Sequence, residues 1–537
     1  MSRETPKFLV ILFALITLLV TAGCLRHDGK APVVNANGEE LHGAWESGSK
    51  NIAVFRGVPF AQPPIDNLRW RAPLANTARP GPQKATEFAP ACMQTTYTTD
   101  WYADVAKAFG HGPESAARPG AISEDCLYLN IWTPQLDSSA NLPVMVWVHG
   151  GSNKGGWSYE PNYIGAKLAA KGVIVVTTSY RLGAFGFFSH PLLDNDDGEP
   201  VANFGLLDSI EAFRWVAQNI RAFGGDPDNI TAFGESSGAG DISDWITTDI
   251  AEERLYRRSI LQSSAGSLVA RRSLADEQNL GRRLIDSIGL KGEPSAENIR
   301  QIPAEDILTA AEEELAGHYF DAVIDQLTLR LSPLASLGDM TKFETDVLIG
   351  SNADEWYMYI DESVGRADLE QKIAQLAPGH EAELLAMVAQ ETDVRRAMDR
   401  IMTAAEMLCP SRYLASTVSR LGGRGWVYYF SRQRSGAGGE QLGAYHGTEI
   451  PYVFDTHDDW LPVEETDQIL TETVMDYWVQ FAATGNPNIQ GQPEWPVYNS
   501  NNPRVMELGD NISAIAPPDK RLCELLGPES LQDSPGL

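Results

Sequence analysis

Residues 234–238 read GESSG, directly after a short apolar run at residues 230–233 and before a segment of helical character. A serine between two glycines in a strand–turn–helix segment is typical of a nucleophile elbow, where a tight turn exposes the hydroxyl at the edge of a sheet. Side chains two positions either side of Ser236 would collide with neighbouring backbone, which explains glycine at both places. We predict that Ser236 is a nucleophile for acyl transfer.

The nucleophile needs a base, because a serine hydroxyl is weakly reactive until its proton is taken. In this arrangement the chain order is serine, acid, histidine. After Ser236 the better placed histidines are His380, His446 and His457. His446 lies in a glycine-flanked loop, GAYHGTEIPYVF, whereas the other two lie in polar segments where solvated or structural roles are expected. We predict that His446 is the base.

The acid that orients the base is expected just past a strand end. The segment VLIGSNADEW places Asp354 and Glu355 there. Either carboxylate could face the histidine, and side-chain chemistry alone does not choose between them.

The intermediate of acyl transfer needs backbone N–H donors directed at its oxyanion. The segment HGGS, residues 149–152, ends an apolar run and can supply the amides of Gly151 and Ser152. Ser237 supplies the amide after the nucleophile. We expect these three amides to form the oxyanion hole, and His149 to be a structural residue of the loop.

These groups require a scaffold that brings strand ends together. Buried strands are expected at residues 142–148, 173–180, 230–233, 346–350 and 426–430. Helical segments are expected at residues 162–171, 208–223, 367–377 and 381–390. The alternation predicts an α/β fold with a large, mostly parallel central sheet and helices on both faces. Sites in such sheets lie beyond the carboxyl ends of strands, here after Val148, Phe233 and Gly350.

Composition narrows the class of protein further. The chain has 537 residues, 43% of them hydrophobic, so a large buried core is available. The interior has no Pro/Ser/Gly linker, charge block or repeat, which predicts one large domain. A formal net charge of −30 repels phosphate backbones, so no nucleic-acid partner is expected.

The first 24 residues carry an export signal. Arg3 and Lys7 precede an uncharged apolar run at residues 8–20, and small residues lead to Cys24. This pattern predicts a signal peptide of residues 1–23 and resembles a bacterial lipobox, in which the cysteine is lipidated after cleavage. We expect an exported protein of the bacterial cell envelope, periplasmic or outer-membrane associated, that contacts the membrane only through a lipid anchor at Cys24. The alternative is an ordinary cleaved signal in which Cys24 is lost or idle.

The remaining four cysteines, Cys92, Cys126, Cys409 and Cys523, are an even number in a compartment that permits oxidation. Their spacing is not that of a zinc site, so we expect two disulfides and no metal. No organic cofactor is implied either.

A series of motifs covers nearly all of the mature chain, including FRGVPFAQPP, EDCLYLNIWTP, FGGDPDNITAFGESSG, HGTEIPYVF and TGNPN. In this order the series resembles the type B carboxylesterase family, which includes the cholinesterases and belongs to the α/β-hydrolase superfamily. The resemblance implies one α/β-hydrolase domain at residues 28–530. It also implies a serine carboxylesterase that hydrolyses small-molecule carboxylic esters through an acyl-enzyme at Ser236.

The resemblance assigns further residues. Glu355 aligns with the family's catalytic glutamate, and Glu235, Ser263 and Glu449 fall on a buried polar network that supports the histidine. By the same resemblance the cysteines pair as Cys92 with Cys126 and Cys409 with Cys523.

Two departures from the family concern the site. Ser152 stands where a third glycine is usual, which adds a Cβ close to the substrate. Trp101 lies too early in the loop between Cys92 and Cys126 to match the tryptophan that binds choline in cholinesterases, so choline esters are not expected substrates.

Two other readings remain open at this point. The first is a catalytically silent binding or adhesion protein, and the second is a hydrolase of amides, lactones or carbamates. The sequence does not specify the oligomeric state.

Overall fold

The computed structural model describes residues 30–48, 51–194, 201–246, 255–264, 272–290, 294–343 and 345–526. Every helix and strand below belongs to one unit, Pro32–Leu537, which begins after Ala31. Cys24 and the predicted signal segment lie outside the described residues.

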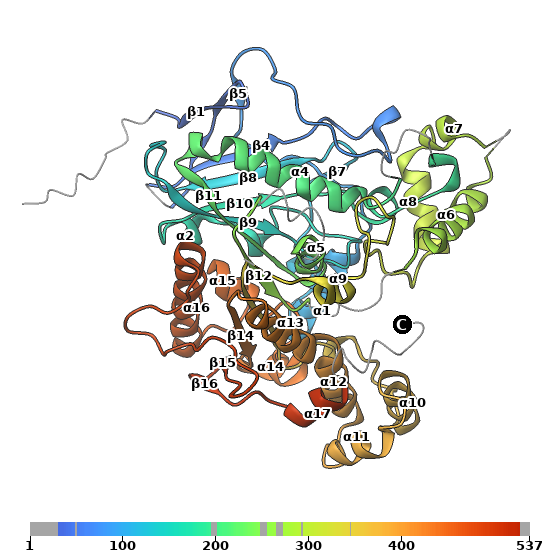
Figure 1. Ribbon diagram of the computed structural model, residues 1–537. Coiled ribbons are helices and arrows are strands. Elements are labelled where there is room, and N and C mark those ends of the chain that lie inside the picture. Colours follow the sequence, from blue (N-terminus) through green and yellow to red (C-terminus); the bar gives the residue numbers. More distant parts are fainter. Residues whose placement is uncertain are drawn as a thin grey trace, which may run out of the picture. The chain divides into compact units, whose positions relative to one another are not determined.

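An eleven-stranded sheet organises this unit (Figure 1). From one edge to the other its strands are β16 (Ile512–Ile515), β15 (Val505–Leu508), β14 (Gly425–Phe430), β13 (Asp346–Asn352), β12 (Arg258–Gln262), β11 (Gly225–Glu235), β9 (Leu142–Val148), β10 (Ile174–Thr178), β8 (Tyr128–Thr133), β4 (Ala53–Pro59) and β3 (Ala44–Trp45). The strands from β15 to β10 run parallel, and the others pair antiparallel with their neighbours. The predicted mostly parallel sheet is confirmed.

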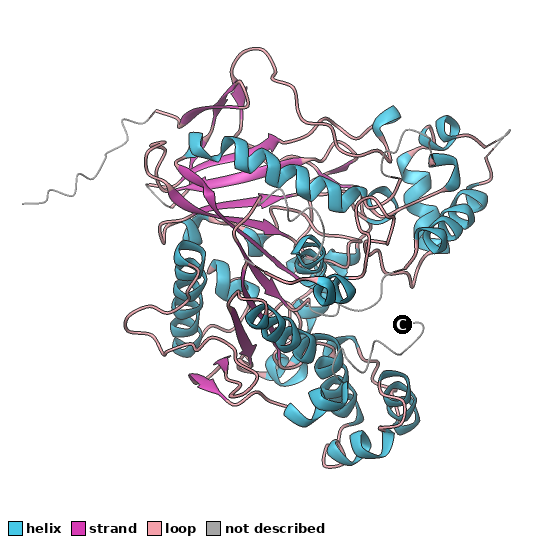
Figure 2. Cartoon of the chain, viewed as in Figure 1, coloured by secondary structure: helices cyan, strands magenta, loops and turns pink. Residues whose placement is uncertain are grey.

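Both faces of the sheet are covered, because successive side chains of a strand point to opposite faces. In β9, Val144, Val146 and Val148 belong to one hydrophobic core, while Met145 and Trp147 belong to another. The first core includes α4 (Phe204–Asn219), α5 (Ser236–Ile246) and α13 (Cys409–Arg420). The second includes α2 (Ala166–Ala169), α15 (Ile450–Phe454) and α16 (Glu465–Thr484). Figure 2 shows the helices packed along the strands, as the sequence predicts.

The other helices lie in connections around the sheet. They are α1 (Tyr97–Ala108), α3 (Gly183–Gly186), α6 (Leu274–Ile288), α7 (Ala296–Arg300), α8 (Ala304–Glu314), α9 (Pro333–Asp339), α10 (Arg366–Leu376), α11 (Glu381–Met387), α12 (Val394–Thr403), α14 (Ala437–Leu442) and α17 (Lys520–Leu526), with a π-helical turn at Ala404–Leu408. Small sheets are formed by β1 (Val33–Ala36), β2 (Glu39–His42) and β5 (Gln83–Lys84), and by β6 (Ala91–Cys92) and β7 (Ile122–Ser123).

Most predicted elements fall close to the observed ones, but the helix predicted at residues 162–171 is wrong in extent. A 3₁₀ turn at Pro161–Tyr163 and the short α2 occupy that segment. Gly165 separates them and packs against the sheet, where an added Cβ would lie 2.7 Å from a methyl carbon of Val175. Close packing on a strand, rather than helix propensity, decides the local structure here.

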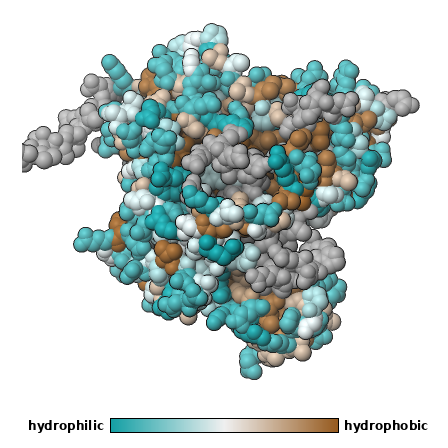
Figure 3. Space-filling model, viewed as in Figure 1, coloured by the Kyte–Doolittle hydropathy of each residue, from teal (hydrophilic) through white to brown (hydrophobic). Residues whose placement is uncertain are grey.

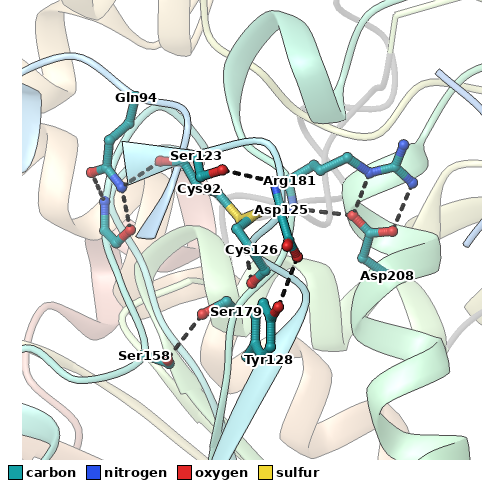
Figure 4. Close-up of a disulfide and its surroundings, with 11 residues drawn as sticks. Cys92, Gln94, Ser123, Asp125, Cys126, Tyr128, Ser158, Ser179, Arg181 and Asp208 are labelled. Atoms are coloured by element: carbon teal, nitrogen blue, oxygen red, sulfur yellow. Dashed lines mark hydrogen bonds and ion pairs between the residues drawn. A yellow bond between two sulfur atoms is a disulfide. The ribbon is translucent and has the colours of Figure 1, made fainter. Parts of the chain in front are cut away.

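The disulfide pairing implied by the family resemblance is the pairing in the structure: Cys92 with Cys126, and Cys409 with Cys523. The first bridge closes a loop of 34 positions that contains α1, and the second joins α13 to α17. Figure 4 shows the side chain of Gln94 beside the first bridge. Its amide donates to the carbonyl of Gly156 at 2.8 Å and accepts from the N–H of the same residue at 2.9 Å. The loop is thereby fixed against the segment that follows β9.

The face drawn in Figure 3 is largely hydrophilic, with hydrophobic residues in separate patches. Among the described residues, no helix has both the length and the apolar character needed to cross a bilayer.

Candidate active site

Ser236 is the first residue of α5, directly after β11, and its φ of 53° lies in the left-handed region that side-chain-bearing residues rarely adopt. The turn is possible because its flanks are glycine. An added Cβ would lie 2.7 Å from the carbonyl oxygen of Val148 at Gly234, and 2.3 Å from it at Gly238. The strained turn holds the hydroxyl beyond the carboxyl end of β11.

Three side chains distant in sequence form a continuous hydrogen-bonded series. The Oγ of Ser236 lies 2.8 Å from Nε2 of His446, and Nδ1 of His446 lies 2.6 Å from Oε2 of Glu355. His446 belongs to the loop between α14 and α15, and Glu355 follows β13. The parallel register of β11, β12 and β13 aligns their carboxyl ends, which places these loops at one edge of the sheet.

Glu355 is almost fully buried and is held from both sides. Its Oε1 accepts from the N–H of Asn352 at 2.7 Å, and its own N–H donates to Oγ1 of Thr403 at 3.2 Å. The other predicted acid points elsewhere: Asp354 pairs with Arg396 at 2.5 Å. The structure therefore brings Glu355, and not Asp354, to the histidine.

The remaining candidate histidines lie outside this series. His457 bonds to Arg434 and to the hydroxyl of Thr471, and His380 precedes α11 at its amino end. His149 is buried, stacks on Tyr180, and bonds to the carbonyl of Gly150 at 2.9 Å. Burial lowers its pKa to about 4, so it is a neutral packing residue at physiological pH.

The family resemblance implies a supporting network of Glu235, Ser263 and Glu449. The two glutamates make polar contacts that connect them to His446 and Glu355. Oε1 of Glu235 lies 3.2 Å from Nε2 of His446. Glu449 accepts from the amide of Asn352 at 2.6 Å, and Asn352 in turn holds Glu355. Ser263 is buried at the end of β12, where its N–H donates to the carbonyl of Gly350; in the described part of the chain its hydroxyl bonds to neither glutamate.

Burial shifts the pKa values of the acids around the imidazole ring of His446. It raises the pKa of Glu235 to about 8 and that of Glu449 above its ordinary value. Burial also opposes the imidazolium of His446, but the neighbouring carboxyl groups of Glu235 and Glu355 outweigh it and raise the pKa of the ring. The ring can therefore accept a proton and hold it as an imidazolium.

The loop after β9 carries the predicted oxyanion amides. Gly151 has a φ of 104°, and an added Cβ there would lie 2.2 Å from the carbonyl oxygen of Gly155. Among the described residues the N–H groups of Gly151 and Ser152 donate to no other group. Ser152 has a φ of 56°, and its hydroxyl bonds to that of Tyr97 at 3.0 Å. Free amides at a left-handed turn are suited to an anion.

The hydroxyl of Ser237 ties that loop to the nucleophile. It accepts from the N–H of Asn153 at 3.1 Å, and the buried side chain of Asn153 is itself bonded to the carbonyl of Phe320 and to the hydroxyl of Tyr180. The turn that follows Ser152 is therefore fixed relative to α5.

A cavity of about 60 Å³ opens on Ser236 and His446. Its walls come from α1, the loop after β9, the elbow and the histidine loop. Trp101 lines this cavity, and its ring lies 3.4 Å from an added Cβ at Gly447. That Trp101 does not match the choline-binding tryptophan stays a prediction. The loop closed by the first disulfide places α1 over the site. The position of a residue along this loop does not show whether its side chain faces the cavity. Glu160 and Asn352 are among the site residues that the sequence analysis missed.

A parallel sheet with a serine elbow after one strand and the base and acid on later loops defines the α/β-hydrolase fold of a serine hydrolase. Comparison with known sequences identifies the group within this class. The chain matches the carboxylesterase family over residues 30–524, and it belongs to that family.

Named relatives share most of this chain. It is 31% identical to fumonisin B1 esterase of Sphingopyxis macrogoltabida, with 88% of this chain and 86% of the relative covered. It is 30% identical to para-nitrobenzyl esterase of Bacillus subtilis, with 92% and 98% covered. A solved structure of a PNB esterase superposes with a TM-score of 0.78 at 28% identity, covering 93% of this chain and all of that one.

These relatives fix the reaction class. The chain is a carboxylic ester hydrolase acting on small-molecule esters. The comparisons lend no support to a catalytically silent binding protein or to amide or lactone hydrolysis.

Proposed function

We propose that Ser236 is the nucleophile, His446 the general base and acid, and Glu355 the residue that orients the ring. The observation that supports this assignment is the unbroken series of contacts at 2.8 Å and 2.6 Å from the hydroxyl through the imidazole to a buried carboxylate. The amides of Gly151, Ser152 and Ser237 serve as the oxyanion hole.

The reaction follows from these positions. His446 takes the proton of Ser236 through Nε2 while Oγ bonds to the acyl carbon, and the carbonyl oxygen becomes an oxyanion facing the free amides. The ring then gives its proton to the leaving alcohol, which departs and leaves an acyl group on Ser236. Water, activated by the same nitrogen, attacks the acyl-enzyme and releases the acid.

The test is covalent labelling with a fluorophosphonate, combined with turnover of a nitrophenyl ester. Ser236→Ala loses both, while its thermal unfolding stays that of a folded protein. The matched control is Ser139→Ala, which removes an exposed hydroxyl from the turn between β8 and β9 and remains labelled. Labelling of Ser236→Ala at the normal rate would show that another residue is the nucleophile.

We also propose that the protein is secreted, with residues 1–23 removed and Cys24 lipidated, so that it stays in the cell envelope. The basic residues, apolar run and small residues before Cys24 support this proposal. In bacterial cells fed a labelled fatty acid, the full chain takes up label and fractionates with membranes, whereas Cys24→Ala does neither. Uptake of label by Cys24→Ala would refute the anchor.

A further inference from the structure

Two successive backbone N–H groups at the proposed acid obtain their acceptors from a helix outside the sheet. The N–H of Glu355 donates to Oγ1 of Thr403 at 3.2 Å, and the N–H of Trp356 donates to Oδ1 of Asp399 at 2.9 Å. Asp399 and Thr403 both belong to α12 and lie four positions apart, so they occupy one face of that helix. At these two residues the loop after β13 is therefore held by side chains of α12.

The carboxyl group of Asp399 also orients the hydroxyl of Thr403. Oγ1 of Thr403 donates its proton to Oδ1 of Asp399 at 3.1 Å. A hydroxyl has one proton and two lone pairs, so this bond leaves the lone pairs of Oγ1 for the N–H of Glu355. Both side chains are buried, at 2% and 4% exposure, which keeps water from replacing either bond. Asp399 therefore acts on both N–H groups, on one directly and on the other through Thr403.

The position of α12 is fixed by the helical segments that follow it. The helix continues through the π-helical turn Ala404–Leu408 into α13, whose first residue, Cys409, is bridged to Cys523 of α17. The additional residue of a π-helical turn rotates the following side chains by about 100°. The turn thereby allows Asp399 and Thr403 to meet the loop of the acid while Cys409 meets α17.

We infer that Asp399 is a positioning residue for ester hydrolysis, which holds the carboxylate of Glu355 at hydrogen-bond distance from His446 through these two N–H groups. The inference rests on the proposed function, because it takes Glu355 as the acid that orients the ring. It extends the groups that determine the acylation rate from the edge of the sheet to α12.

The acceptor atom of Asp399, and not its charge, is expected to perform this role. Burial and the nearby charge of Asp354 raise the pKa of Asp399 to about 7, so the surroundings favour the neutral form of the group. A proton on Oδ2 leaves Oδ1 able to accept both bonds. Asparagine keeps that oxygen, whereas alanine removes it.

The experiment compares Asp399→Ala with Asp399→Asn and measures acylation by a nitrophenyl ester in stopped flow. Asp399→Ala lowers the acylation rate by about ten- to a hundredfold with KM within about threefold of the wild type, because the acid is misplaced rather than removed. Asp399→Asn keeps the acylation rate within about threefold of the wild type, because it keeps the acceptor. The matched control is Arg400→Ala, the next residue of α12, which pairs with Asp519 at 2.6 Å. It lowers stability in urea and leaves the acylation rate unchanged.

A proton signal reports the position of the acid directly. Nδ1 of His446 and Oε2 of Glu355 are 2.6 Å apart, and the proton of such a short, charge-assisted hydrogen bond resonates downfield of the amide region in ¹H NMR. The signal is identified by its absence in His446→Ala. It moves upfield or disappears in Asp399→Ala, and it stays in Asp399→Asn and Arg400→Ala.

Thr403→Val and Thr403→Ser provide the same comparison where Asp399→Ala does not fold. Valine removes the acceptor of the Glu355 N–H and serine keeps it, so the slow rate and the altered signal occur in the valine variant alone. A wild-type rate and signal in folded Asp399→Ala, or otherwise in Thr403→Val, overturn the positioning role, as does an equal loss in Arg400→Ala. A wild-type acylation rate in Glu355→Gln refutes the proposed function instead.

Discussion

Replacing Glu355 by Gln tests the proposed triad most directly, because the surroundings determine how the new amide must lie. The N–H of Asn352 donates to Oε1 of Glu355 at 2.7 Å, so a glutamine keeps its oxygen there and turns its NH₂ toward Nδ1 of His446. The ring must then accept at Nδ1 and carry its proton on Nε2. In that tautomer Nε2 cannot take the proton of Ser236.

The magnitude follows from the lost charge. The carboxylate and the imidazolium have charge centres about 4 Å apart, which at an effective dielectric constant of about 20 is about 4 kcal/mol. That energy stabilises the transition state, in which the ring is charged, so its loss lowers kcat by roughly a thousandfold. The inverted tautomer lowers it further, whereas the fold is retained because the variant removes a buried charge.

The assay is stopped-flow acylation by a nitrophenyl ester, with substrate binding measured through KM. The control is Asp354→Asn at the adjacent position, where the carboxylate pairs with Arg396 instead of the ring. We expect it to lower stability and to leave the acylation rate within about tenfold of the wild type. Acylation by Glu355→Gln at more than about a tenth of the wild-type rate would refute the reasoning, because neither the charge nor the tautomer would then matter.

Three further predictions concern the base, the cavity and a disulfide. His446→Ala lowers kcat/KM by about a thousandfold or more in steady-state assays, since the base acts as part of a unit; near-normal turnover would point to another base. The pKa of Glu160 rises from an ordinary 4.5 to about 7, so the folded protein binds the extra proton and loses stability as pH rises from 4.5 to 7. Relative to Glu160→Gln, the wild-type free energy of unfolding in urea therefore falls by about 3 kcal/mol over this range, and a constant difference would contradict the buried neutral acid. Changing Cys409 and Cys523 to serine opens a bridge that spans 114 positions, and the chain-entropy model gives a loss of about 5 kcal/mol in unfolding free energy, whereas an unchanged melting temperature would contradict it.

The central strands were predictable because parallel strands are apolar on both faces. Residues 142–148 form β9 with the predicted bounds, and residues 346–350 begin β13. The antiparallel edges were not predicted. Strands β15 and β16 have four residues each, and their assignment depends on the pairing of β15 with β14 and of β16 with β15. Such short segments carry too little periodicity to distinguish them from loops.

The elbow was predictable from its local pattern of glycines around Ser236, although the contacts that require Gly234 and Gly238 are with the carbonyl oxygen of Val148 on the neighbouring strand. The choice between Asp354 and Glu355 was open, because both follow the same strand end. The N–H of Asp354 donates to the carbonyl of Ala444, and its carboxylate accepts from the N–H of Ala444 and pairs with Arg396. Glu355 is therefore the acid left to bond to the imidazole. Those partners lie about forty to ninety positions away, beyond the reach of a local pattern.

The residues that line the substrate cavity could not be predicted from the sequence, because strand order does not position them. Ser236, Glu355 and His446 follow strands whose register aligns their ends, so strand order alone brings them to one edge. Trp101 and Thr98 sit instead on α1, which is positioned by a disulfide and by the paired hydrogen bonds of Gln94 with Gly156. Since those constraints are independent of the sheet, changes in α1 can alter the lining of the cavity while the reacting groups stay in place. Substrate choice in this fold is therefore separable from the chemistry, and variants of α1 should change the ratio between esters more than the rate of acylation itself.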